Sequence, residues 1–230
     1  MLVAGFPAGS FQTNCYVVAP APGEECVIVD PGQDAVEGVD DLLREHRLKP
    51  VAVLLTHGHI DHMWSVVPVC GARDVPAWIH PDDRELLSDP AKGFPGPARQ
   101  MFGGLEFGEP DDVRELSDGA VLELAGLELT VDHRPGHTRG SVTFRTPVRD
   151  SQGRDTHVLF SGDLLFAGSI GRTDLPGGDH AVMLRSLAKT MTLPDDTVVL
   201  PGHGPQTTIG RERATNPFLG NVAAGPSRGL

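Results

Sequence analysis

The sequence predicts an α/β protein in which two β-sheets pack against each other and helices cover their outer faces. Two observations predict this fold class: segments of strand type dominate each half of the 230-residue chain, and segments of helix type close each half. A third observation is that no linker or change of composition divides the chain. We therefore expect one domain over residues 1–220 and a flexible C-terminal tail over residues 221–230.

The first half alternates short apolar runs with turn signals, a pattern that is typical of strands. The expected strands cover residues 2–6, 11–19, 25–30, 51–55 and 77–79. Apolar residues spaced three to four apart, from Val36 to Leu43, predict a helix over residues 35–47. A second helix is expected over residues 62–70 and a short one over residues 82–87.

The second half follows a Gly- and Pro-rich segment, residues 89–112, that carries Phe94, Met101, Phe102 and Phe107. Such a segment is typical of a lid or a binding loop, although aromatic side chains more often pack onto the core. The strands expected beyond it cover residues 121–124, 127–131, 141–145, 157–161 and 197–200. The helices expected there cover residues 180–191 and 207–218.

The most informative segment is Thr56-His57-Gly58-His59-Ile60-Asp61-His62, directly after the apolar run from Val51 to Leu55. A strand that ends here delivers three histidines and a carboxylate to the edge of a sheet. Neutral imidazole is the commonest metal ligand, and a carboxylate is its usual oxygen partner. The positive end of the helix that follows helps to keep His62 neutral, as ligation requires. The segment therefore predicts a metal site.

Three later segments also end a predicted strand on a residue that can bind a metal. They are Pro135-Gly136-His137, Ser161-Gly162-Asp163 and Pro201-Gly202-His203. A single histidine after Pro-Gly is more often a turn residue than a ligand. Four such strand ends in one chain favour a metal centre over the alternative, in which polar residues merely crowd the surface loops.

These residues resemble the metallo-β-lactamase superfamily, whose signature is His-x-His-x-Asp-His with a downstream His, Asp and His. The resemblance implies an αββα sandwich of two mixed β-sheets with outer helices. It also implies the following ligands: His57, His59 and His137 for one metal, Asp61, His62 and His203 for a second, and Asp163 as a bridge. Asp61 would also orient the nucleophile. A set of nitrogen and oxygen ligands suits two divalent ions, with zinc as the first expectation and iron or manganese as alternatives.

Within the superfamily, the segments Ser161-Gly162-Asp163, Gly171-Arg172-Thr173-Asp174 and Thr208–Arg213 resemble the short bacterial branch of glyoxalase II, the hydroxyacylglutathione hydrolases. This resemblance implies a thioester hydrolase whose partner is a small-molecule acyl thiol, with a 2-hydroxyacyl group as the first expectation. Arg172 is the candidate for binding a substrate carboxylate. An alternative role for Arg172 is a structural salt bridge with Asp174.

The chemistry of the leaving group agrees with a thioester substrate. Two dications lower the pKa of a shared water towards about 7 and stabilise the developing oxyanion. A thiolate, with a conjugate-acid pKa of about 8.5, leaves with little protonation, whereas an amide nitrogen needs a proton. The alternative function is a persulfide dioxygenase, in which a single iron would be held by His57, His137 and Asp163.

The composition excludes several other classes of protein. A net charge of −12 argues against a nucleic-acid partner, because nucleic-acid surfaces need clustered Lys and Arg. The three cysteines are odd in number and share no CxxC spacing, which suggests a reducing compartment. No apolar run approaches membrane length, and the first ten residues have no basic region of the signal-peptide type. We therefore expect a cytoplasmic enzyme without a membrane partner.

Overall fold

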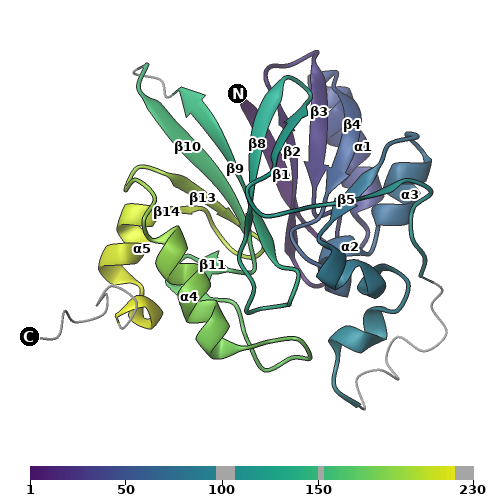
Figure 1. Cartoon of the computed structure of the whole chain (residues 1–230). Coiled ribbons are helices and arrows are strands. Elements are labelled where there is room, and N and C mark those ends of the chain that lie inside the picture. Colours follow the sequence, from purple (N-terminus) through teal and green to yellow (C-terminus); the bar gives the residue numbers. More distant parts are fainter. Residues whose placement is uncertain (97–106, 150–152, 221–230) are drawn as a thin grey trace, which may run out of the picture.

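The computed structural model describes residues 1–96, 107–149 and 153–220, and it contains two six-stranded sheets that pack face to face. Helices cover the outer face of each sheet (Figure 1). Both sheets contain parallel and antiparallel pairs. The predicted αββα sandwich of two mixed β-sheets is thereby confirmed. Residues 221–230, the predicted tail, lie outside the described residues.

The first sheet follows the order of the chain. Its strands are β1 (Leu2–Ala8), β2 (Thr13–Ala19), β3 (Glu25–Val29), β4 (Lys49–Leu54), β5 (Ala77–Ile79) and β6 (Val113–Glu115). The first three strands pair antiparallel and the remaining pairs are parallel. Parallel neighbours need a crossover connection, which helix α1 (Ala35–His46) supplies between β3 and β4.

The second sheet has the order β14-β13-β10-β9-β8-β7. Its strands are β7 (Val121–Leu124), β8 (Leu127–His133), β9 (Val142–Arg149), β10 (Asp155–Gly162), β13 (Val198–Pro201) and β14 (Thr207–Thr208). Among the described residues of this sheet, β10 and β13 form the one parallel pair, with helix α4 (His180–Thr190) in the connection between them. A two-stranded ribbon, β11 (Leu165–Phe166) and β12 (Ser169–Ile170), lies between β10 and α4 in the chain.

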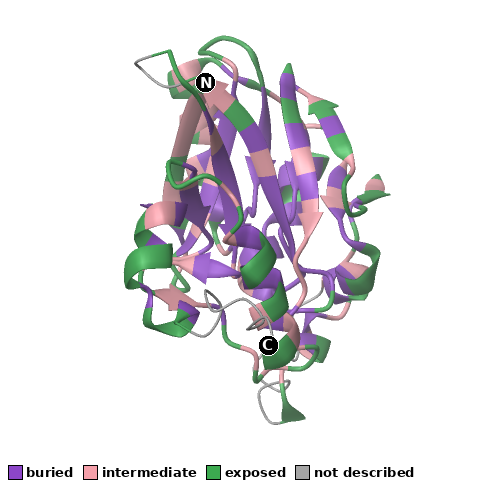
Figure 2. Ribbon diagram, turned by 60° about the vertical axis from the view of Figure 1, so that its left-hand side comes forward, coloured by how far each residue is buried: buried purple, intermediate pink, exposed green. Residues whose placement is uncertain are grey.

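The core has three layers because successive residues of a strand face opposite sides of a sheet. In β2, Val17 packs between the first sheet and its helices, whereas Val18 packs between the two sheets. The layer outside the second sheet contains Met183 and Leu187 of α4 and Ile209 of α5 (Ile209–Thr215). Figure 2 shows the buried strands inside and the exposed outer faces of the helices.

The helix predicted over residues 62–70 is divided into α2 (Ile60–Met63) and α3 (Val66–Gly71). Pro68 explains the division, because it has no N–H to donate to the carbonyl of Trp64. A proline also ends α5: residues 207–218 form β14, α5 and a 3₁₀ turn, Pro217–Leu219, instead of one helix. The predicted short helix over residues 82–87 is a 3₁₀ helix, Pro81–Leu87.

The Gly- and Pro-rich segment over residues 89–112 begins with a 3₁₀ turn, Pro90–Gly93. Phe94 and Phe107 pack against the core outside the first sheet, and the rings of Phe107 and Trp64 lie 5.6 Å apart. Packing onto the core is therefore the observed arrangement for these two aromatics. Met101 and Phe102 lie outside the described residues.

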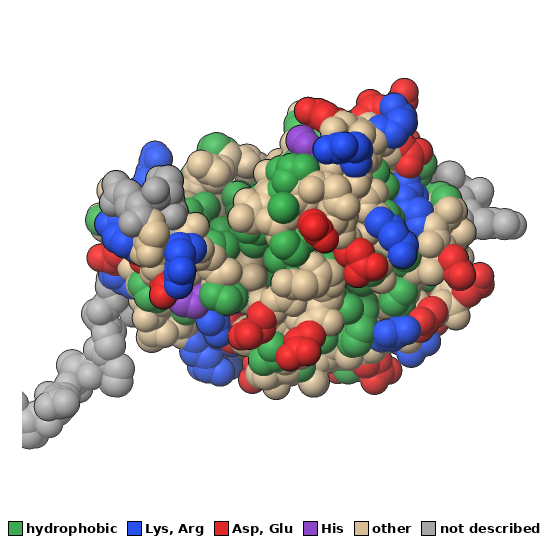
Figure 3. Space-filling model, turned by 90° about the horizontal axis from the view of Figure 1, so that it is seen from above, with side chains coloured by type: hydrophobic (Ala, Val, Ile, Leu, Met, Phe, Trp, Pro, Cys, Tyr) green, Lys and Arg blue, Asp and Glu red, His purple; other side chains and the backbone are tan. Residues whose placement is uncertain are grey.

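The surface carries mixed charge. On the face that Figure 3 shows, acidic and basic side chains are interspersed around apolar ones. Many of the described cations are paired, for example Arg73 with Asp40 and Arg84 with Glu109. Among the described helices, none is long and apolar enough to cross a bilayer.

Candidate metal centre

The fold brings together all seven of the metal-ligand candidates that the sequence predicts. One group consists of His57, His59 and His137, a second of Asp61, His62 and His203, and a third of His57, His62 and Asp163. Within each group, one potential ligand atom from each residue lies within 4.8 Å of the others. The first two groups have the membership that the resemblance implies for the two metals.

Strand ends deliver these side chains to one edge of the sandwich. The loop after β4 carries His57 and His59, and α2, which follows it, carries Asp61 and His62. The loop between β8 and β9 carries His137, and Asp163 and His203 follow β10 and β13. This edge lies at the lower end of the sheets in Figure 1, near α2 and β11. Strands are rigid elements, so ligands placed at their ends are held in position before any metal arrives.

Asp163 lies between the two histidine groups. Its Oδ1 is 3.3 Å from His62 Nε2, and its Oδ2 is 3.5 Å from His137 Nε2 and 3.7 Å from His203 Nε2. The carboxylate therefore lies near members of both groups, His137 of the first and His62 and His203 of the second. A carboxylate can share its two oxygens between two ions, which a single ring nitrogen cannot do.

Buried atoms without partners support a metal at this point. His57 Nε2, His62 Nε2 and Asp163 Oδ1 are inaccessible to solvent and have no hydrogen-bond partner. An unpaired buried polar atom is costly, and native proteins seldom tolerate one. His57 belongs to the first of the two groups and His62 to the second, so ions bound by the two groups would satisfy these atoms. The ligand set thus fits divalent metals.

Outer hydrogen bonds fix the ring orientations of two of the candidates. Asp30, which is buried, accepts hydrogen bonds from Thr56 N at 2.8 Å and Thr56 Oγ1 at 2.6 Å, and it lies 2.9 Å from His62 Nδ1. The carbonyl oxygen of Arg172 lies 2.8 Å from His137 Nδ1. Both arrangements place the proton on Nδ1 and leave Nε2 as the ligand, as is usual for histidines that bind metals.

Sequence reasoning missed Asp30 and Asp83. Asp30 precedes Pro31-Gly32, which predicts only a turn, although it also ends a strand on a carboxylate. Asp83 accepts hydrogen bonds from Gly58 N at 3.0 Å and Gly140 N at 2.8 Å, so it ties the loop of His57 and His59 to the loop of His137. Nothing near Asp83 in the sequence signals this role.

The electrostatics of the site favour neutral forms of His57 and His59 and a positive charge on His62. Burial, together with the neighbouring histidines, lowers the pKa of His57 well below its usual value and that of His59 to about 3. Burial also opposes charge on His62, but Asp163, Asp61 and Asp30 outweigh it and raise the pKa of His62. The sequence-based expectation of a His62 kept neutral by the helix end is therefore not met, because α2 has only four residues and three carboxylates lie nearby. The same carboxylates would attract a metal cation.

Gly202 leaves the space that the centre requires. A Cβ at this position would contact Asp163 Oδ1 and would lie 2.6 Å from His62 Cε1. Ordinary carbon contacts are about 3.5–4.0 Å, so any side chain here would displace a ligand. The glycine before His203 is therefore part of the site.

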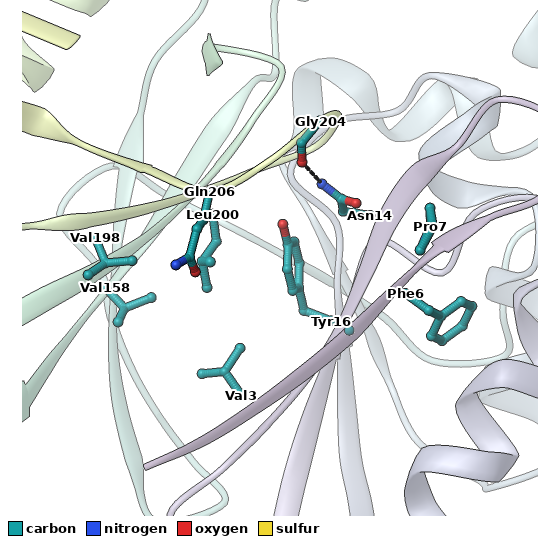
Figure 4. A pocket seen from close by; sticks show the side chains of 11 residues that line it. Val3, Phe6, Pro7, Asn14, Tyr16, Val158, Val198, Leu200, Gly204 and Gln206 are labelled. Carbon is teal, nitrogen blue, oxygen red and sulfur yellow. Dashed lines mark hydrogen bonds between the residues drawn. The ribbon is translucent and has the colours of Figure 1, made fainter. Parts of the chain in front are cut away.

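Polar residues of β2 hold the loop that carries His203. The Asn14 side-chain amide donates to Pro201 O at 2.9 Å and Gly204 O at 2.8 Å, and the Tyr16 hydroxyl donates to Pro201 O at 2.8 Å. Asn14 and Tyr16 also line a pocket of about 420 Å³ between β1–β2 and β10–β13 (Figure 4). One wall of this pocket is therefore the support of a metal-ligand loop.

Replacing Asn14 with alanine should weaken binding of the ion held by Asp61, His62 and His203. Two hydrogen bonds to the ends of the loop would be lost, and outer-shell changes typically cost about 10- to 100-fold in metal affinity. Competition with a chromophoric chelator measures this affinity. Gln206→Ala, in the same pocket, is the control and should have no such effect. Equal affinities in Asn14→Ala and the parent would show that the loop does not need this support.

The guanidinium of Arg172 is paired with a neighbour in the sequence. Its Nε donates to Asp174 Oδ1 at 2.7 Å and its Nη2 to Asp174 Oδ2 at 2.6 Å. The salt bridge that the sequence offers as one alternative is thus present. The side chain of Arg172 is nevertheless 61% exposed, so its guanidinium faces solvent. The backbone carbonyl of the same residue contacts His137 Nδ1, so the guanidinium lies close to the metal centre in the chain.

Comparisons with known proteins agree with this geometry. The chain is 34% identical over 220 residues to hydroxyacylglutathione hydrolase GloC of Haemophilus influenzae, a match that covers 93% of this chain and 95% of the relative. A crystal structure of the B3 metallo-beta-lactamase BLEG-1 is similar with a TM-score of 0.80 and 39% identity, over 95% of this chain and 100% of that one.

A second solved structure, TTHA1623 in a di-iron-bound form, has a TM-score of 0.75 and 40% identity, over 94% of this chain and 100% of that one. Residues 8–203 match the family model described as the metallo-beta-lactamase superfamily, and this range includes all seven candidate ligands. With two mixed sheets, outer helices and His and Asp clusters that fit divalent metals, the chain belongs to the metallo-beta-lactamase superfamily.

Proposed function

We propose that this metal-dependent hydrolase carries two divalent ions and cleaves thioesters, with 2-hydroxyacyl thiols as its substrate class. The observation that carries the proposal is the arrangement of two three-residue ligand groups around one shared carboxylate, Asp163. Similarity to hydroxyacylglutathione hydrolase GloC supports the substrate class.

The two ligand groups differ in their access to solvent. The side chain of His203 is 30% exposed and that of Asp61 is 17% exposed, whereas His62 is fully buried. His57, His59 and His137 are buried as well. A substrate would therefore approach from the side of Asp61 and His203.

The ions, when bound, would polarise the thioester carbonyl and lower the pKa of the attacking water. The residues of the chain supply position and charge. Asp61 Oδ2 accepts a hydrogen bond from Thr13 Oγ1 at 3.2 Å and lies 3.1 Å from His203 Nε2, so its carboxylate is held in place. We infer that Asp61 both binds metal and orients the water. The thiolate leaves without needing a separate acid.

Aromatic rings lie beside both ends of the centre. The ring of Phe94 is 6.3 Å from that of His59, and the ring of Phe166 is 6.1 Å from that of His203. Apolar contacts discriminate between ligands by only about 1–3 kcal/mol each. We therefore expect the enzyme to accept several thiol carriers, with S-lactoylglutathione among them.

Arg172→Ala is expected to raise KM for an anionic thioester by about tenfold and to change kcat little. Loss of a charge-assisted hydrogen bond costs roughly 1.5 kcal/mol or more, and a contact made equally in the ground and transition states affects KM. Steady-state kinetics on a lactoyl thioester measure both constants. Asp174→Asn is the matched control, since it frees the guanidinium without removing it. Equal increases of KM in both variants would assign the pair a purely structural role.

The arrangement of ligands favours two ions over the single iron of a persulfide dioxygenase. A site built from His57, His137 and Asp163 alone would leave the other four candidates without a role. These four, His59, Asp61, His62 and His203, nevertheless lie in the same clusters. A binuclear hydrolase uses every member of the set.

The proposal is tested by release of free thiol from lactoyl thioesters of glutathione, coenzyme A and a small thiol. The metal-loaded protein should release thiol from each, and chelation should stop the release. Oxygen uptake with a persulfide substrate is recorded in parallel and should be absent. Oxygen uptake without cleavage of any thioester would contradict the proposal and favour the dioxygenase.

A further inference from the structure

A further His and Asp group lies outside the centre and has no part in the proposed reaction. It consists of His80, Asp82 and His133, whose potential ligand atoms lie within 4.8 Å of one another. His80 follows β5 of the first sheet, Asp82 lies in the 3₁₀ helix Pro81–Leu87, and His133 is the last residue of β8 in the second sheet. The group therefore joins the two halves of the sandwich.

We propose that His80, Asp82 and His133 form an accessory site for one divalent transition-metal ion, of which zinc is the probe of choice. Two imidazoles and one carboxylate make a set of nitrogen and oxygen ligands that suits such an ion. Water would occupy the remaining position, because the side chain of Asp82 is 56% exposed. The proposal of this site depends only on His80, Asp82 and His133, and it is independent of the function proposed for the metal centre.

Hydrogen bonds identify the ligand atoms. The carbonyl oxygen of Arg139 lies 2.8 Å from His133 Nε2, and a carbonyl can only accept, so the proton is on Nε2 and the lone pair on Nδ1. Donation of the second ring nitrogen to a backbone carbonyl is the usual arrangement of a metal-bound histidine. His80 Nδ1 accepts a long hydrogen bond from Asp82 N at 3.3 Å and lies 3.8 Å from Asp82 Oδ2. The free lone pair is thus on His133 Nδ1, and an ion bound to His80 Nδ1 and Asp82 Oδ2 would replace the long hydrogen bond from Asp82 N.

The present ring positions require one movement before an ion can bind. The rings of His80 and His133 are stacked, with centroids 4.1 Å apart and planes inclined by 10°. An ion cannot lie in both planes at once, so one ring must turn about its Cβ–Cγ bond. The side chain of His80 is only 11% exposed, whereas His133 is half-buried and lines a surface pocket with Asp82. His133 and Asp82 are the ligands with room to move.

The site is connected to the loops of the metal centre. Asp83, the residue after Asp82, accepts hydrogen bonds from Gly58 N and from Thr138 Oγ1, which lie next to ligand candidates of the centre. An ion bound to Asp82 would hold the neighbouring Asp83, and through it both loops of the centre, more firmly. Its expected effects are higher thermal stability and slower loss of metal from the centre, with no part in the chemical step.

The test counts zinc per chain after dialysis against excess zinc, by elemental analysis, in the full-length protein. The parent should bind one equivalent more than Asp82→Asn and one more than His133→Ala. Excess zinc should also raise the melting temperature of the metal-loaded parent, and this rise should be lost in both variants. Asp82→Asn changes an exposed side chain without changing its shape, so this variant should fold normally. It therefore tests the site even if His133→Ala is misfolded.

His46→Ala is the matched control, because His46 is half-buried like His133 and belongs to no metal-binding group of described residues. It should retain the full zinc count of the parent. Equal zinc counts in the parent, Asp82→Asn and His133→Ala would overturn the proposal, and so would loss of the same equivalent in His46→Ala. The difference of one equivalent is expected whether the centre holds two ions or one, so it is independent of the proposed function.

Discussion

Replacing Asp163 with alanine is expected to empty both metal positions at once and to reduce thioester cleavage to the background rate. The physical reason is its position, since its Oδ1 faces His62 and its Oδ2 faces His137 and His203. Loss of a residue that only hydrogen-bonds to a metal ligand already costs about 10- to 100-fold in metal affinity or activity. Loss of a ligand shared by two ions should cost more. Elemental analysis after gel filtration measures the metal content.

The comparison for Asp163→Ala is His203→Ala, which removes a ligand from the second group only. This variant should lose mainly one ion and keep the ion held by His57, His59 and His137. Circular dichroism confirms that both variants remain folded. Two tightly bound ions in Asp163→Ala would show that this carboxylate does not bridge the groups.

Gly202→Ala should abolish metal binding through a single added methyl group. The new Cβ would overlap Asp163 Oδ1 and lie 2.6 Å from His62 Cε1, and the backbone on both sides of Gly202 is tied down. Gly202 N donates to Gly162 O at 2.9 Å, and Asn14 N donates to Gly202 O at 2.7 Å. The loop cannot retreat without breaking these bonds. We expect kcat/KM to fall by on the order of 100-fold or more, because a displacement of about 1 Å can cost that much.

Gly71→Ala is the matched control for the added methyl group, since a Cβ at that position in α3 meets no atom within 4 Å. Its metal content and activity should equal those of the parent. If Gly202→Ala bound metal as the parent does, the loop would have to be free to move, and the packed site described above would be wrong.

The strands and the seven ligand candidates could be predicted because their signals are local. An apolar run followed by glycine and a polar residue predicts a strand end, and four such ends carry the candidates. The break between α2 and α3 was harder to predict from the sequence. The apolar spacing continues through residues 62–70, although Pro68 interrupts the helical hydrogen bonds. The short strand β6 exists only through pairing with the distant strand β5, and β14 consists of only two residues, too few for a sequence pattern.

The supporting residues of the centre could not be predicted because their roles depend on contacts between distant segments. Asp83 meets Gly140 across 57 positions of the chain, and Asn14 meets Gly204 across 190. The pairing of Arg172 is different, since Asp174 is only two residues away and the sequence already offers it as a partner. There the choice depends on a side-chain rotamer, which sequence patterns do not specify.

The proposed reaction needs two ions that act together in the cleavage of a thioester. The most direct measurement is a titration of the metal-free protein with zinc, in which the release of thiol from a lactoyl thioester is followed at each ratio. The rate is predicted to rise until about two equivalents are bound and then to level off, with no gain from an ion at the accessory site. A rate that levels off at one equivalent, or no thiol release at any zinc content, would contradict the account.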